Sequence, residues 1–194
     1  MTTEKKTFDT KTIALGAILT AIVIVLQYLG SFIHLGPFSI SLVLLPIVIG
    51  AAMCGKAIST WLGFVFGVVV LISGDAAAFL SVNAVGTVIT VLAKGALAGL
   101  VAGIVYSLLS KFNTYVAVVV AAIACPVVNT GIFLIACRIF FFETITEWAA
   151  GMDVVKFMFV GLVGLNFLVE LAINVVLSPT IVKLINIFKK PAKA

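Results

Sequence analysis

Long apolar stretches, separated by short breaks that are polar or contain glycine and proline, divide the chain into six segments. A helix needs roughly 20 apolar residues to cross the hydrocarbon of a bilayer. The second and third stretches are near or below that length. The last three exceed it, so we expect them to be tilted, kinked or to project from the membrane. The six predicted spans cover residues 12–32, 39–54, 57–72, 84–109, 115–142 and 154–187.

The composition indicates that lipid is the solvent for these segments. Of 194 residues, 63% are hydrophobic and only 10% are charged, and the mean hydropathy is +1.36. Soluble domains carry roughly 45–50% apolar and about 25% charged residues. Backbone groups in lipid need internal partners, which limits spans to helices or closed barrels. Because the runs lack the alternation of barrel strands, we predict an all-α integral membrane protein, a compact bundle of six transmembrane helices.

Lysines set the predicted orientation, because positive charge collects in cytoplasmic loops. With six spans, most lysines outside the membrane fall on one side, together with both chain ends. We therefore expect one membrane domain over residues 1–194, with its N- and C-termini cytoplasmic. Residues 1–11 form a cytoplasmic segment, 12–187 the bundle and 188–194 a basic tail. The net charge of +5 fits this anchoring, and no basic stripe interleaved with aromatic residues favours nucleic acid.

Ionisable and amide side chains lie inside the predicted spans. Lys94 in the fourth span and Glu170 in the sixth are near mid-span, and we expect them to form an intramembrane charge pair. Charges in lipid are costly and face the bundle interior, where they serve packing or mark a substrate or ion pathway. Both roles stay open. Asn166 shares a helix face with Glu170, and Asn129 in the fifth span serves either helix packing or ligand contact.

Small residues mark faces where helices approach each other closely. The first span carries Ala17 and Ala21 in a small-xxx-small step, and the fourth carries Gly95, Gly99 and Gly103. We expect the glycine face to pack inside the bundle. The alanine face has two interpretations, internal packing or the docking of a partner.

Catalytic chemistry has little support in this sequence. The chain has one histidine, which excludes histidine-based metal sites and Ser-His-Asp chemistry, and it has no GxxxxGK[ST] phosphate loop. The three cysteines lie in or beside apolar segments without metal-type spacing, so we interpret them as packing residues. We expect no enzyme activity, no metal and no cofactor on this chain. ATP, if it drives the protein, binds to another chain.

Several of these features together resemble the substrate-binding S component of energy-coupling factor (ECF) vitamin transporters. They are six spans in 194 residues, both ends inside, the AxxxA step at Ala17 and Ala21, and the run GPFSISLVLLPIVIGA at residues 36–51. The resemblance covers nearly the whole chain. It implies a multi-pass protein of a bacterial-type plasma membrane that binds a water-soluble vitamin or vitamin precursor with high affinity near the outer face.

The resemblance also implies partners and site residues. The partners are the vitamin, a transmembrane coupling subunit that docks on Ala17 and Ala21, and two ATPase subunits that bind ATP. No subfamily pattern singles out one vitamin, although Arg138 and Lys156 favour an anionic one such as pantothenate. Asp75 is equally suited to capping a loop. The implied pocket lies among the last three spans and the outer loops, and its candidate residues are Asp75, Asn83, Asn129, Arg138, Trp148 and Asn166.

Two other functions fit the same sequence. A self-sufficient secondary transporter would couple a small solute to protons through Lys94 and Glu170, and its uptake would collapse with the proton gradient. A structural or assembly membrane protein without a ligand would respond to Asn129→Ala or Arg138→Ala through stability alone. A docking role of the alanine face favours the multi-chain importer over both.

Overall fold

The structure, a computed structural model, describes residues 9–32, 34–35, 38–39 and 42–189. Most of the predicted N-terminal segment and most of the predicted basic tail lie outside these residues. The elements in chain order are α1 (Thr10–Gly30), β1 (His34–Leu35), β2 (Phe38–Ser39), α2 (Leu44–Met53), α3 (Lys56–Ser73), α4 (Ala77–Leu80), α5 (Ala84–Leu109), α6 (Thr114–Phe140), α7 (Phe142–Trp148), α8 (Val154–Lys156), the π-helix η1 (Phe157–Leu162) and α9 (Gly164–Lys189). The two short strands pair antiparallel.

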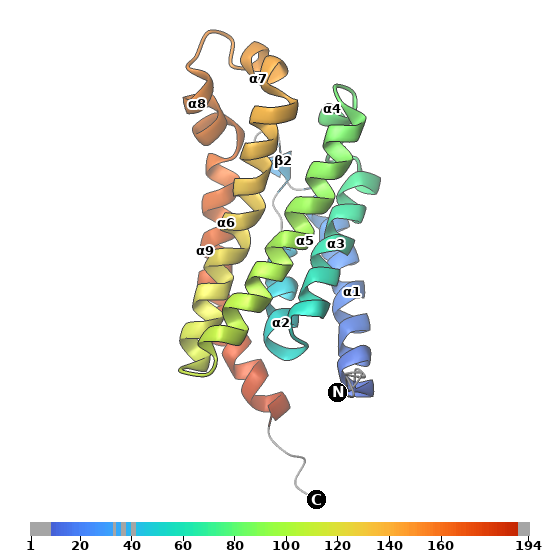
Figure 1. The fold of residues 1–194 in the computed structure, drawn as a ribbon, viewed down its shortest axis with the longest axis vertical. Coiled ribbons are helices and arrows are strands. Elements are labelled where there is room, and N and C mark those ends of the chain that lie inside the picture. Colours follow the sequence, from blue (N-terminus) through green and yellow to red (C-terminus); the bar gives the residue numbers. More distant parts are fainter. Residues whose placement is uncertain (1–8, 33, 36–37, 40–41, 190–194) are drawn as a thin grey trace, which may run out of the picture.

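The predicted six-helix membrane bundle is confirmed. Within the described residues, five helices are long and apolar enough to cross a membrane, namely α1, α3, α5, α6 and α9, and α2 is a shorter apolar helix. Helix α1 begins and α9 ends at the same end of the bundle, whereas α4, α7 and α8 lie at the opposite end (Figure 1). We call this opposite end the α7 end.

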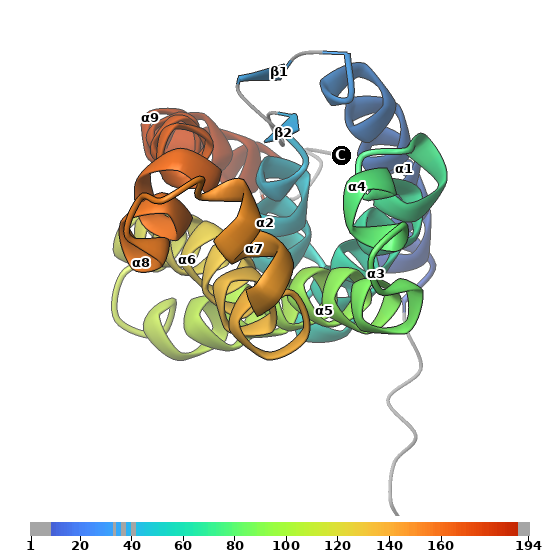
Figure 2. The ribbon, with the colours of Figure 1, turned by 90° about the horizontal axis from the view of Figure 1, so that it is seen from above.

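Helix α2 lies in the middle of the bundle, and the other long helices surround it (Figure 2). It contacts α1, α3, α5, α6 and α9, and its buried residues include Leu44, Ile47 and Val48. The prediction of a span over residues 39–54 was too long, because the helix has only 10 residues, about 15 Å. A helix that is apolar all round is a buried one. Backbone outside a helix is tolerated at membrane depth only where protein encloses it, and five helices pack around α2.

Helices α3 and α5 pack with their backbones nearly in contact. A Cβ atom at Gly63 would overlap the carbonyl oxygen of Gly95, and one at Gly99 would overlap the carbonyl oxygen of Ser59. The expected internal packing of the glycine face is therefore confirmed. This close approach fixes the rotation of α5 relative to α3.

The connections at the α7 end contain more helix than the sequence indicated. The connection between α3 and α5 contains helix α4, and the connection after α6 contains helices α7 and α8. The predicted sixth span is interrupted, since η1 precedes α9. Gly74 ends α3 with a φ of 90°, a left-handed conformation that glycine adopts without strain. This turn brings Asp75 to the bundle interior.

Candidate functional site

A cavity lies in the half of the bundle nearest the α7 end. Its walls come from the ends of α1 and α3, from α4, from the first half of α5, from the second half of α6 and from the start of α9. The space open to the centres of water molecules is about 100 Å³, several times the roughly 10–15 Å³ that one water needs. The cavity therefore has room for a small organic molecule rather than for one trapped water.

Helix α5 contributes a polar face to the cavity. Thr87, Thr90 and Lys94 are spaced i, i+3 and i+7, so they share one side of the helix, and all three line the cavity. The Thr87 hydroxyl donates to the carbonyl oxygen of Asn83 at 2.7 Å, and the Thr90 hydroxyl donates to that of Gly86 at 2.6 Å. Because both hydroxyl protons are used within the helix, the two oxygens face the cavity as hydrogen-bond acceptors.

The Lys94 ammonium group lies between two aromatic rings. Its Nζ atom is 5.6 Å from the ring centroid of Phe66 on α3 and 5.5 Å from that of Phe133 on α6. Both distances are within the range in which a cation is attracted to a ring face. Glu170 and then Asp75 are the carboxylates that attract this ammonium group. The structure thus brings both residues of the predicted charge pair, Lys94 and Glu170, to one cavity.

Helices α6 and α9 supply amide and carboxylate groups. Asn129 on α6 is 6% exposed, and its side-chain oxygen has no hydrogen-bond partner among the described residues. On α9, Asn166 and Glu170 line the cavity. The π-helix η1 immediately precedes them, and single π turns inside membrane or soluble helices often occur at functional sites.

A hydrogen bond joins α1 to the cavity wall. The Gln27 side-chain nitrogen donates to a carboxylate oxygen of Asp75, and both residues line the cavity. Gln27 is 2% exposed, and its side-chain oxygen has no partner among the described residues. The contact therefore leaves Gln27 with one hydrogen-bond acceptor that is buried and unsatisfied.

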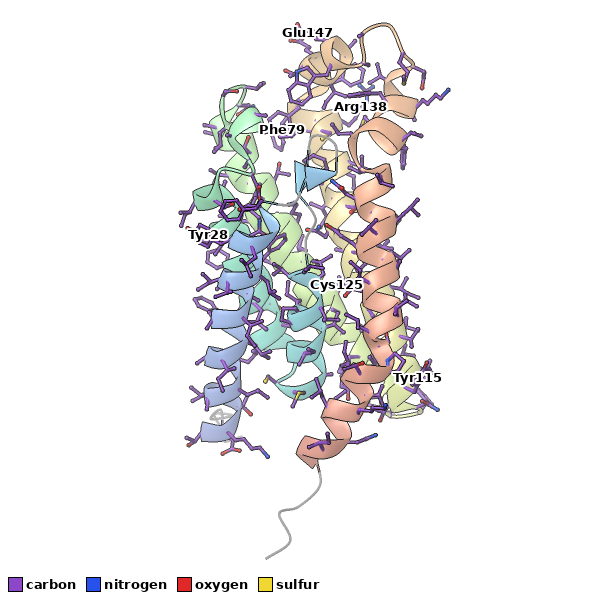
Figure 3. All side chains as sticks on the ribbon, turned by 180° about the vertical axis from the view of Figure 1, so that it is seen from behind. Tyr28, Phe79, Tyr115, Cys125, Arg138 and Glu147 are labelled. Atoms are coloured by element: carbon purple, nitrogen blue, oxygen red, sulfur yellow. The ribbon has the colours of Figure 1, made fainter. Side chains whose placement is uncertain are left out.

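Aromatic rings close the cavity toward the α7 end. The Phe79 ring on α4 meets the rings of Phe133, Phe141 and Trp148 edge to face, at centroid distances of 5.5, 4.9 and 5.4 Å. Phe79, Phe133 and Phe141 line the cavity, and Trp148 on α7 packs against Phe79. Figure 3 shows Phe79 near the α7 end, far from Tyr115 at the other end of the bundle. The rings connect α4, α6 and α7 over the polar interior.

A protein-family model described as "ECF transporter, substrate-specific component" matches residues 11–182. The chain belongs to this family. The matched range contains all of the cavity residues. No curated protein and no solved structure matches the chain. As an ECF substrate-specific component, the chain is a multi-pass membrane transport subunit rather than an enzyme, with a substrate ligand and an interaction with ECF coupling and ATPase modules.

Three of the pocket residues predicted for this substrate-specific component lie together in the cavity. Asp75 lines it from the turn between α3 and α4, Asn129 from α6 and Asn166 from α9. The sequence had singled them out as polar residues at plausible depths in the membrane. Their contact with a ligand stays a prediction.

The other three predicted pocket residues lie outside the cavity lining. Asn83 caps α5, where its side chain accepts the backbone N–H of Gly86 at 2.8 Å. Trp148 packs on Phe79, one layer behind the cavity wall. Arg138 is exposed near the α7 end (Figure 3), and its guanidinium carbon lies 3.8 Å from the centroid of the Phe142 ring. Ligand contacts of these three residues stay predictions, and Arg138 has a packing role of its own.

Sequence reasoning missed Thr87 and Thr90 as cavity residues. The signal was available, because Thr87, Thr90 and Lys94 form one polar stripe on an otherwise apolar helix. The phenylalanines of the cavity had no comparable signal. The chain contains 15 phenylalanines, and in a membrane protein an apolar ring fits the lipid face as well as the interior.

Replacing Asn83 by alanine should lower the stability of α5 and leave the affinity for the substrate nearly unchanged. Loss of an N-cap costs about 1 kcal/mol, measured as a lower unfolding temperature of the purified protein. Asn113→Ala is the matched control, because Asn113 caps α6 by accepting the N–H groups of Tyr115 and Val116 at 2.8 and 3.1 Å. Substrate binding that is ten times weaker in Asn83→Ala alone would show that Asn83 touches the ligand.

Proposed function

We propose that this substrate-specific component is the high-affinity binding subunit of an ATP-driven importer for a water-soluble vitamin or vitamin precursor in a bacterial-type plasma membrane. The observation that carries the proposal is the cavity, which combines charged, amide, hydroxyl and phenyl groups inside a membrane bundle. Small-molecule sites are concave, mostly apolar and contain a few converging polar groups. Ionisable residues inside a membrane point to a substrate pathway by default.

Energy comes from partner subunits in this proposal. Two ATPase subunits bind and hydrolyse ATP, and a transmembrane coupling subunit docks on Ala17 and Ala21 of α1. Both alanines are exposed on the bundle surface, which supports a docking role over internal packing. The alternative is a self-sufficient transporter in which Lys94 and Glu170 couple a solute to protons. Both residues line the cavity, where a solute could contact them. The dependence of uptake on the proton gradient therefore distinguishes the two functions.

The first experiment is mass spectrometry of small molecules extracted from the purified chain in lipid nanodiscs. We expect one vitamin or precursor at nearly one molecule per chain. Uptake of that compound into cells should require the ATPase subunits and should survive a protonophore as long as ATP is maintained. Uptake by this chain alone that collapses with the proton gradient would instead establish the secondary transporter. A chain that retains nothing and binds no vitamin would contradict the importer and favour the proton-coupled transporter or a structural protein.

Asn129→Leu should weaken retention of the extracted compound by about tenfold, which corresponds to about 1.4 kcal/mol. Leucine has a similar size, but it cannot accept a hydrogen bond from a ligand as the Asn129 oxygen can, which has no partner among the described residues. Asn174→Leu is the matched control, because Asn174 is also buried, at 1% exposed, but does not line the cavity. Isothermal titration of both purified variants measures the effect. Equal affinities in the two variants would argue that Asn129 serves helix packing only.

A further inference from the structure

We infer that the substrate is a monocarboxylic acid that also carries hydroxyl or amide donors, and that Lys94 binds its carboxylate. The inference rests on the proposed function and names the class of compound that the same cavity takes. The basis is the cavity itself, in which some hydrogen-bonding groups have partners among the described residues and others do not.

Within the described residues, the cavity group whose hydrogen-bonding capacity is unused is the ammonium of Lys94. An ammonium group has three N–H donors and no acceptor. The described contacts of this one are the ring faces of Phe66 and Phe133, and no hydrogen bond to an oxygen is recorded for it among the described residues. Ring faces attract a cation, but they do not replace the charge-assisted hydrogen bonds that an oxyanion forms with it.

The carboxylates of the cavity are already engaged. Asp75 accepts a hydrogen bond from Gln27, and Glu170 is not without an interaction partner. Both attract Lys94 electrostatically. What the cavity lacks is therefore an anionic oxygen at Lys94, and not a cation beside the carboxylates. A cationic ligand would add a second positive charge beside Lys94 and leave its N–H groups without acceptors.

The other groups of the cavity that can bind a ligand are hydrogen-bond acceptors, so they need donors on the ligand. The side-chain oxygens of Gln27 and Asn129 are buried and have no partner within the described part of the chain. The hydroxyl protons of Thr87 and Thr90 are used within α5, so their oxygens also offer lone pairs to a ligand. A hydroxyl or amide N–H on the ligand would satisfy these acceptors.

One carboxylate is favoured over two. A first carboxylate is compensated by direct contact with Lys94. A second negative charge on the ligand would lie in the same enclosed space as Asp75 and Glu170 without a cation of its own, because no further lysine or arginine among the described residues lines the cavity. Like charges in a site with little water repel strongly. The sequence had suggested an anionic substrate through Arg138 and Lys156, both outside the cavity lining. In the structure Lys94 is the cation that lines it.

The test compares acids with their uncharged counterparts by isothermal titration of the full chain in nanodiscs. The pairs are pantothenate and pantothenol, nicotinate and nicotinamide, and biotin and biotinamide, with thiamine as a cationic probe. We expect an acid of this panel to bind, and its uncharged counterpart to bind about 30-fold more weakly, as the loss of a charge-assisted hydrogen bond implies. Pantothenate has the best match of groups, since it combines one carboxylate with hydroxyl and amide donors.

Lys94→Met removes the charge and keeps the length of the side chain. It should weaken binding of the acid by about 30-fold and weaken binding of the uncharged counterpart much less, because a neutral oxygen loses no charge-assisted hydrogen bond. Lys111→Met is the matched control, because Lys111 is exposed just beyond the other end of α5, and it should change neither. If Lys94→Met does not fold, the ratio between acid and uncharged counterpart in the wild-type chain decides by itself.

Each outcome bears on the inference. Tighter binding of an uncharged compound or of thiamine, or an uncharged or cationic compound retained by the purified chain, overturns it and leaves the proposed function intact. An acid whose affinity is unaffected by Lys94→Met overturns the role of Lys94. A retained compound that is a monocarboxylic acid from outside the panel supports the inference. A chain that retains nothing and binds nothing overturns the proposed function as well.

Discussion

Replacing Gly99 by leucine should abolish the packing of α3 against α5 and leave little folded protein. A Cβ atom at this position would overlap the backbone carbonyl oxygen of Ser59, and a backbone atom cannot rotate away as a side chain can. One turn earlier in α5, Gly95 meets the carbonyl oxygen of Gly63 in the same way, so relieving the overlap at Gly99 would also disturb the contact at Gly95. Overpacking costs typically 1–3 kcal/mol, and we expect about 3 kcal/mol here.

Gly131→Leu is the matched control for Gly99→Leu. Gly131 also lies within a long helix, α6, but nothing is within 4 Å of a Cβ atom built there. This variant should be as stable as the wild type or slightly more stable, because glycine disfavours a helix by about 1 kcal/mol relative to alanine. The measurement is the fraction of monodisperse protein that survives a temperature ramp. Equal survival of both variants would mean that α3 and α5 are further apart in the membrane.

The main features of the fold were predictable because the membrane restricts what a chain can do. Backbone groups must be paired in lipid, so each long apolar run became a helix, and the glycine face of α5 was recognisable as a packing face. Helix α2 was harder to predict. The run 39–54 is largely apolar, and nothing in its composition indicates that its helix has only 10 residues and packs against five other helices.

The candidate site was predictable only where lipid makes a polar group costly. Lys94, Asn129 and Glu170 lie deep in their spans, and all three line the cavity. At helix ends a polar residue is a weaker sign of a ligand site. Asn83 caps α5 there, and Arg138 contacts the ring of Phe142. The pairing of Gln27 with Asp75 joins residues 48 positions apart, and no local pattern signals such a contact.

Replacing Ala17 or Ala21 by tryptophan should stop transport and leave substrate binding intact. Both alanines are exposed on α1, whereas Val23 and Gln27 on the other face of the same helix are buried. A large side chain on the exposed face therefore meets lipid in the isolated chain and does not disturb the cavity. Against a docked coupling helix the same side chain prevents the close approach that small residues permit.

The expected loss in transport is large. An overpacked interface costs about 1–3 kcal/mol, so uptake through the coupling subunit should fall by about 10- to 100-fold. The measurement is uptake of the compound identified by mass spectrometry, in cells that contain the coupling and ATPase subunits. Titration of the purified variants should give affinities within about twofold of the wild type, since no cavity contact changes.

Val176→Trp is the control for these substitutions. Val176 is 73% exposed on α9, and α9 lies on the opposite side of the bundle from α1 (Figure 2). Because this variant also adds an indole to the lipid face, a general effect of bulk would appear in it as well. Loss of binding in Ala17→Trp would show that the alanine face supports the cavity from within. Normal uptake in both alanine variants would mean that the coupling subunit docks on another surface. A helix packed closely on these alanines would be displaced by a tryptophan side chain.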